Sequence, residues 1–172
     1  MRQNRRTVIG VQSESKKLMM PAKCVMSESH AVKCELAAEV LRSSGRLRLQ
    51  VTGWSMLPSI WPGDTLTVEQ VGFPKVAEGE IILFRRERRL FAHRVVRSEG
   101  SDMITRGDSM AAADPPVDGD EVLGRVVFII RNGKRFQPRT SLRIHERVVA
   151  GVVQRSDLAA RVLVGARERL QT

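Results

Sequence analysis

The sequence predicts a mainly β fold of the α+β class, with one helix before the strands and a helical extension after them. Short runs of alternating or continuous apolar residues dominate the 172-residue chain between residues 47 and 130. An apolar stripe with helical spacing precedes these runs, and a second helical pattern follows Pro138. These three observations indicate a β-rich core flanked by helices.

The helix before the strands is expected over residues 32–44, where four apolar side chains fall on one stripe and Gly45 follows as a stop signal. The four are Val32, Leu36, Val40 and Leu41. Residues 1–30 mix Arg, Lys, Ser and Gln without periodicity. We therefore expect a disordered basic arm in this region.

The strands are recognised by alternation and by the turn signals between them. Gly63-Asp64 separates two runs, the charged sequence RRERR marks a hairpin tip, and Asn132-Gly133 follows the longest run. The expected strands span residues 47–52, 65–71, 80–84, 90–96, 103–105 and 121–130.

The apolar pattern after Pro138 predicts a helix or a broken helix pair whose opposite side carries arginines. Its apolar face comprises Leu142, Val149, Val152, Leu163 and Leu170. The chain is thus divided into an arm (1–30), a core domain (31–134) and a basic amphipathic extension (135–172). The extension either packs on protein or lies on an anionic membrane surface.

Composition narrows the choice of partners. Lys and Arg outnumber Asp and Glu by 29 to 19, and the net charge of +10 suggests an acidic partner or simply a basic surface. Cys24 and Cys34 lack the spacing of a metal or redox site, so no cofactor is expected. A disulfide between them is one alternative, and we favour buried thiols. No apolar run approaches the roughly 18 residues of a membrane span, and no secretory signal is visible, so a cytoplasmic location is expected.

The stretch GWSMLPSIWPGD, residues 53–64, is either a plain loop between strands or a turn that presents a nucleophilic serine. Ser55 lies in a tight turn, where Gly53 would permit a close backbone approach. His93 shares an inward strand face with Phe91 and Val95. Taken singly, such a serine is usually structural and such a histidine is usually a core residue. Asp108 and Asp114 would likewise serve as turn or cap residues.

Together, the motifs GWSMLP, GDTLTV, GEIILF, HRVV and RGDSMAAAD occur in an order that resembles the type I signal peptidases and the related LexA-like self-cleaving repressors. The resemblance covers about residues 50–130. It implies a LexA/signal-peptidase-like β-rich fold. It also implies that the serine of the S-M-x-P motif, Ser55, is the nucleophile.

The same resemblance suggests the other catalytic residues. Most bacterial members use a lysine base, whereas the endoplasmic-reticulum and archaeal type has a histidine followed by an arginine, which His93-Arg94 matches. The lysines after Ser55 are Lys75 and Lys134, and neither lies on a strand beside the histidine position. A Ser-His pair is therefore expected.

The acidic motif of that type, G-D with a second Asp six residues on, is matched by Asp108 and Asp114. We favour Asp108 as the partner of His93, because a strand end fixes a side chain better than a loop does. Asp114 would hold the following loop closed. With glycine at position 53, backbone N–H groups around Ser55 and Met56 would have to form the oxyanion hole.

Two hypotheses follow. One is a serine endopeptidase that cleaves an extended protein or precursor peptide paired with the strand before Ser55. The other is a catalytically inactive LexA-like binding or regulatory domain. Nucleic acid is not expected as a partner, because residues 1–45 supply one helix, too few for a helix-turn-helix.

Overall fold

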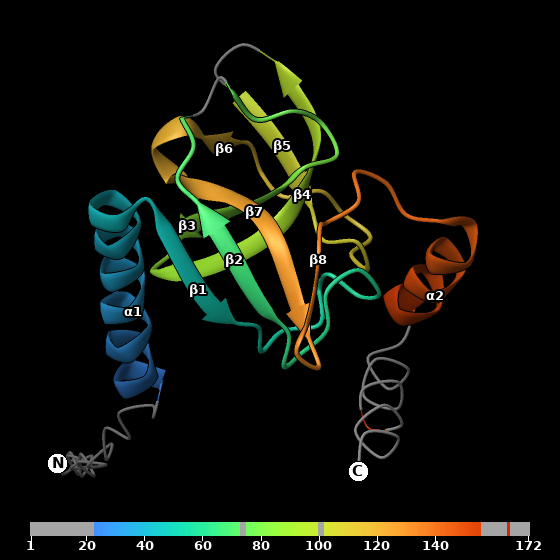
Figure 1. The fold of residues 1–172 in the computed structure, drawn as a ribbon, viewed down its shortest axis with the longest axis horizontal. Coiled ribbons are helices and arrows are strands. Elements are labelled where there is room, and N and C mark those ends of the chain that lie inside the picture. The colour runs from blue at the N-terminus through green and yellow to red at the C-terminus, as the bar shows by residue number, and fades with distance from the viewer. Residues whose placement is uncertain (1–22, 73–74, 100–101, 156–164, 166–172) are drawn as a thin grey trace, which may run out of the picture.

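A computed structural model describes residues 23–72, 75–99, 102–155 and 165 of the chain. A mainly antiparallel β-sheet fold carries one helix at each end, as the sequence predicts (Figure 1). The elements run in the order α1 (Lys23–Ser44), β1 (Arg46–Gln50), β2 (Thr65–Glu69), β3 (Ile81–Arg86), β4 (Arg89–Glu99), β5 (Asp102–Arg106), β6 (Val117–Asp118), a 3-10 turn (Gly119–Glu121), β7 (Val122–Arg131), β8 (Lys134–Phe136) and α2 (Ile144–Arg155).

Helix α1 is longer than predicted, because it begins at Lys23 within the stretch assigned to the arm. It ends where Gly45 adopts a φ of 69° and donates its N–H to the Leu41 carbonyl at 2.8 Å, a left-handed cap that suits glycine. Residues 1–22 of the predicted arm lie outside the described part of the chain. Contacts with β1 and β4 fix α1 against the sheet.

The buried face of α1 differs from the predicted stripe. Cys34, Ala37 and Leu41 are buried, whereas Val32 and Leu36 are 66% and 61% exposed. Cys34 is a free thiol, as expected, and burial raises its pKa. The side chain of the other cysteine, at position 24, lies outside the described set.

The sheet has the strand order β1-β2-β7-β3-β4-β5-β6, with β8 paired to β7, and all these pairs are antiparallel. Strand β3 is buried on both faces: Ile81 and Leu83 join one apolar cluster, and Ile82 and Phe84 join another. Alternation along one strand therefore links the two halves of the core. Among the described strands, β1 and β6 lie at the two ends of this order, and β8 also has a single neighbour, β7.

Both predicted hairpins are present. The β3–β4 tip has positive φ at Glu87 (49°) and Arg88 (60°), and the β7–β8 tip has positive φ at Asn132 (50°) and Gly133 (71°). Two successive positive φ values are those of a type I′ turn, whose twist matches the flanking strands. The second hairpin adds β8, which the sequence does not predict.

The C-terminal extension forms α2, whose Val149 and Val153 pack against Leu57 and Trp61. Val152, which the sequence places on the same face as Val149, is instead 50% exposed. Two members of the predicted face, at positions 163 and 170, lie outside the described residues. Within the described part of the chain, no helix combines the length and apolar character of a membrane span.

Candidate active site

The turn from Gly53 to Asp64 follows β1 and carries Ser55. Leu57 and Ile60 are buried within it. At its end, the buried carboxylate of Asp64 accepts hydrogen bonds from the Trp61 N–H at 2.8 Å and the Arg131 Nη2 at 2.6 Å. The turn that presents Ser55 is thus held in place by the buried side chains of Leu57 and Ile60 and by the ion pair between Asp64 and Arg131.

His93 on β4 lies between a serine and a carboxylate. Its Nε2 is 3.0 Å from Ser55 Oγ, and its Nδ1 is 2.7 Å from Asp114 Oδ2. The His93 side chain is 5% exposed, and its ring lies 5.9 Å, centroid to centroid, from each of the Phe84 and Phe91 rings. The inward face predicted for His93 is confirmed, and the three polar groups form one hydrogen-bonded line.

Asp114 is held by β5 as well as by His93. Thr105 Oγ1 donates to Asp114 Oδ2 at 2.7 Å, and the Asp114 N–H donates to the Thr105 carbonyl at 2.8 Å. Burial alone would raise the pKa of this carboxyl. The hydrogen bonds from His93 and Thr105, together with the charges of His93 and Arg86, outweigh burial and lower the pKa below its usual range. Asp114 is therefore poised as a carboxylate.

Asp108 occupies a different position from the one expected. Arg94 Nε and Nη2 donate to its two carboxylate oxygens, each at 2.8 Å, and both side chains are buried. Arg94 also donates to the Gly79 carbonyl at 2.7 Å and to the Arg139 carbonyl. The prediction that Asp108 is the partner of His93 is wrong, because Asp108 pairs with Arg94 and Asp114 pairs with His93.

The glycine that approaches Ser55 closely is Gly107. A methyl group on Gly107 would lie 2.6 Å from the Ser55 carbonyl oxygen and 3.1 Å from Ser55 Cβ, whereas one on Gly53 would meet nothing within 4 Å. The expected close approach at Gly53 is therefore absent. The residue after Asp108 completes the contact: Ser109 donates to the Ser55 carbonyl from its N–H at 3.0 Å and from its Oγ at 2.9 Å.

Sequence reasoning missed Thr105, Gly107 and Ser109. The available signals were a threonine in a short apolar strand and a G-D-S sequence after it, but the contacts depend on β5 lying beside the Ser55 turn. In the described part of the chain, no acceptor is paired with the N–H groups of Ser55 and Met56.

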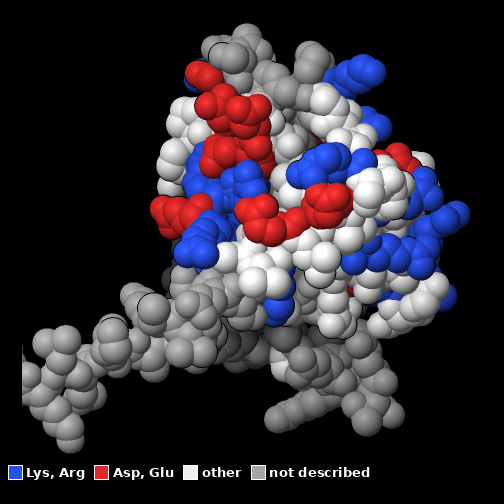
Figure 2. Space-filling model, turned by 90° about the vertical axis from the view of Figure 1, so that its left-hand side faces the viewer, with Lys and Arg blue, Asp and Glu red and all other residues white. Residues whose placement is uncertain are grey.

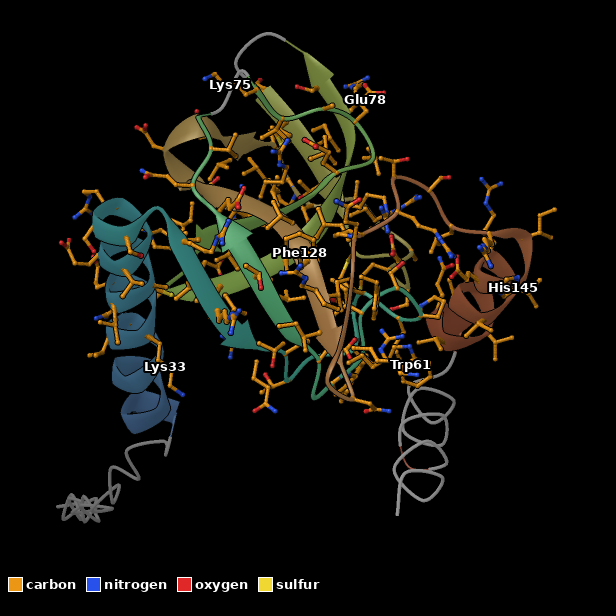
Figure 3. The ribbon with its side chains drawn as sticks, in the orientation of Figure 1. Lys33, Trp61, Lys75, Glu78, Phe128 and His145 are labelled. Carbon is orange, nitrogen blue, oxygen red and sulfur yellow. The ribbon has the colours of Figure 1, made fainter. Side chains whose placement is uncertain are left out.

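The other candidate base, lysine, is placed away from the serine. Lys75 precedes β3 at the far end of the sheet (Figure 3), and Lys134 begins β8. Among the described residues, no cluster of His, Cys, Asp and Glu could hold a metal ion. The groups that lie beside Ser55 Oγ are the His93 imidazole and, through it, the Asp114 carboxylate.

An apolar groove of about 620 Å³ begins at this turn and continues to α1. Thr52, Gly53 and Met56 line the end nearest Ser55, and Leu36 and Val40 line the end formed by α1. Its sides come from β1 and from residues 89–92 of β4.

Two comparisons with known proteins bear on this arrangement. Residues 20–127 match the family model described as Peptidase S24-like. No curated protein matches the chain. The matched region begins before α1 and includes the Ser55 turn, His93, Asp108 and Asp114. The chain therefore belongs to the Peptidase S24-like family of serine peptidases.

Proposed function

We propose that this chain is an active serine endopeptidase that cleaves an extended segment of a protein or precursor peptide through an acyl-enzyme at Ser55. The observation that carries the proposal is the single line of hydrogen bonds from Ser55 Oγ through the His93 imidazole to Asp114. It supports a Ser-His-Asp arrangement, the form implied by the resemblance of His93-Arg94 to the endoplasmic-reticulum and archaeal type of signal peptidase.

In the first step, Ser55 Oγ attacks the scissile carbonyl while His93 Nε2 takes the hydroxyl proton. The resulting imidazolium then gives that proton to the leaving amine, and the C–N bond breaks. Water repeats the sequence on the acyl-enzyme and releases the carboxylate product. Asp114 accepts the Nδ1–H of His93, which keeps Nε2 free as the base and stabilises the transient imidazolium.

The oxyanion formed in each step needs hydrogen-bond donors. The N–H groups of Ser55 and Met56 are proposed for this role, because they have no acceptor within the described residues. Ser109 supports them indirectly, since it holds the Ser55 carbonyl from the opposite side. A preorganised donor of this kind contributes roughly 3 kcal/mol to lowering the barrier.

The substrate segment is proposed to run along β1. In the described sheet, β1 pairs with β2 alone, and we propose that the substrate adds a strand at its other edge. The groove beside that edge is lined mainly by apolar side chains, including Leu47, Leu49 and Phe91. Main-chain pairing gives affinity with little selectivity, and alternate apolar side chains of the substrate would fill the groove. The resemblance adds a preference for small residues beside the cleaved bond.

The proposal is tested with Ser55→Ala and, as a matched control from the same turn, Ser59→Ala. Wild type and Ser59→Ala should be labelled at residue 55 by a serine-reactive acylating probe and should cleave a peptide containing Ala-x-Ala. Ser55→Ala should do neither while keeping its melting temperature, because a small side chain is removed from a turn that is anchored elsewhere. Wild-type protein that takes up no label would instead favour the inactive binding domain.

A further inference from the structure

Helix α2 has two apolar faces, and one of them is exposed in the described part of the chain. Val149, Ala150 and Val153 form the inner face, and the two valines pack on Leu57 and Trp61 of the nucleophile turn. The second face, which we call the outer stripe, consists of Ile144, Val148 and Val152, which are 83%, 63% and 50% exposed. Their spacing of four residues places them in one row along roughly 12 Å of helix.

The charge around the outer stripe is positive. Arg143 and Arg147 are exposed beside it, and His145 points away from the sheet (Figure 3). Glu146 is the acidic residue of α2, and it is already engaged: its Oε2 accepts the Arg143 N–H at 2.7 Å and its Oε1 accepts from Arg139 at 3.4 Å. The stripe is therefore flanked by cations without a free carboxylate in the helix.

Helix α1 provides the contrast. It also exposes two apolar residues four positions apart, Val32 and Leu36, but acidic and basic side chains are interleaved on that face of the molecule (Figure 2). Glu35 pairs with Arg85, and Glu39 lies one turn further along the helix. The combination of an exposed apolar row and flanking cations is thus found on α2 and not on the described part of α1.

We propose that the outer stripe of α2 docks on the surface of an anionic lipid bilayer. Aliphatic side chains in a row would enter the boundary between headgroups and acyl chains, and Arg143 and Arg147 would reach the lipid phosphates. A second copy of the chain fits this surface less well, because it would bring arginines against arginines without a carboxylate to pair with them. The net charge of +10 favours approach to the same surface.

Docking in this manner would set the active-site turn at the membrane. The inner face of α2 packs directly on Leu57, two residues after Ser55, and on Trp61, which lies next to α2 (Figure 3). The bilayer and the nucleophile turn would therefore contact opposite sides of one short helix. A segment cleaved by this protein would be presented within about a helix diameter, roughly 10 Å, of the lipid headgroups.

Vesicle co-sedimentation of the full chain tests the proposal. Phosphatidylcholine vesicles and vesicles with added phosphatidylglycerol are compared at low and high ionic strength. Wild-type protein should pellet with the anionic vesicles at low salt, and its partitioning should fall about tenfold at high salt. Arg143→Gln/Arg147→Gln should lose most of this salt-sensitive binding.

The matched pair of variants is Val148→Gln/Val152→Gln on α2 and Val32→Gln/Leu36→Gln on α1. All four positions are exposed, so circular dichroism should report wild-type melting for both proteins. The α2 variant should lower partitioning about tenfold, and the α1 variant should leave it unchanged. Equal binding to neutral vesicles, equal loss in the α1 variant, or self-association in sedimentation velocity that the α2 variant abolishes would each overturn the proposal.

Discussion

Gly107→Ala should slow acylation of Ser55 without unfolding the protein. The added methyl group would lie 2.6 Å from the Ser55 carbonyl oxygen, where ordinary contact begins at 3.4 Å. The two backbones must therefore separate by about 0.8 Å. Ser109 also holds the same carbonyl, through its hydroxyl at 2.9 Å. Because the close contact is with the backbone of Ser55, rotation of a side chain cannot relieve it, and the nucleophile itself must move.

The consequence is a misplaced hydroxyl. Ser55 Oγ is 3.0 Å from His93 Nε2, and a displacement near 1 Å at a reacting group costs about 10²-fold in rate, or about 2.7 kcal/mol of barrier. The rate constant for acylation by a serine-reactive probe should fall by that factor. Gly53→Ala, which meets nothing within 4 Å, should react near the wild-type rate. Wild-type kinetics in Gly107→Ala, or equal losses in both variants, would refute the reasoning.

Four further outcomes are expected. Asp114→Asn should lower the acylation rate by up to roughly 10⁴-fold while the protein stays folded, because the His93 tautomer is no longer fixed. Asp108→Asn should instead lower the free energy of unfolding by about 3 kcal/mol, since buried Arg94 loses its counter-charge. A large loss of acylation rate in Asp108→Asn and a mild one in Asp114→Asn would exchange the roles of the two aspartates. The lowered pKa of Asp114 means that its contribution to stability is full above the ordinary aspartate range and is lost as the pH falls through the folded-state pKa. The difference in melting temperature between wild type and Asp114→Asn should therefore shrink on acidification, and a difference that stays constant from neutral to strongly acidic pH would contradict the assignment. Gly53→Ser has room for its side chain and should raise the acylation rate by up to about 10²-fold if the hydroxyl reaches the oxyanion, whereas an unchanged rate would show that the backbone donors suffice.

Most strands and turns could be predicted from the sequence because their signals are local, whereas the short strands β6 and β8 were not. Gly63, Asn132 and Gly133 mark turns through backbone freedom, and alternation fixes which strand residues point inward. Helix α1 was harder to predict. Its exposed and buried stripes both contain apolar residues, and contacts with β1 and β4 decide that Cys34 and Leu41 face the core.

The site was only partly predictable for a related reason. The inward face of His93 follows from period two along β4, which is local information. The close approach of Gly107 to Ser55 joins segments that are remote in sequence. Sequence reasoning therefore assigns the close approach to Gly53, the glycine two residues before the serine. Thr105 and Ser109 also act through contacts between β5, the following loop and the Ser55 turn.

The choice between the two aspartates follows from the dipeptide His93-Arg94. Consecutive residues of a strand point to opposite faces, so β4 offers an imidazole on one side and a guanidinium on the other. The loop after β5 supplies one acid to each: Asp108 to Arg94 and Asp114 to His93. The guanidinium is permanently charged and already neutralises Asp108, which leaves that carboxylate little to offer an imidazolium that forms for only part of each cycle. Asp114 is paired with the group whose charge changes, and its negative charge is therefore available when His93 accepts the proton from Ser55.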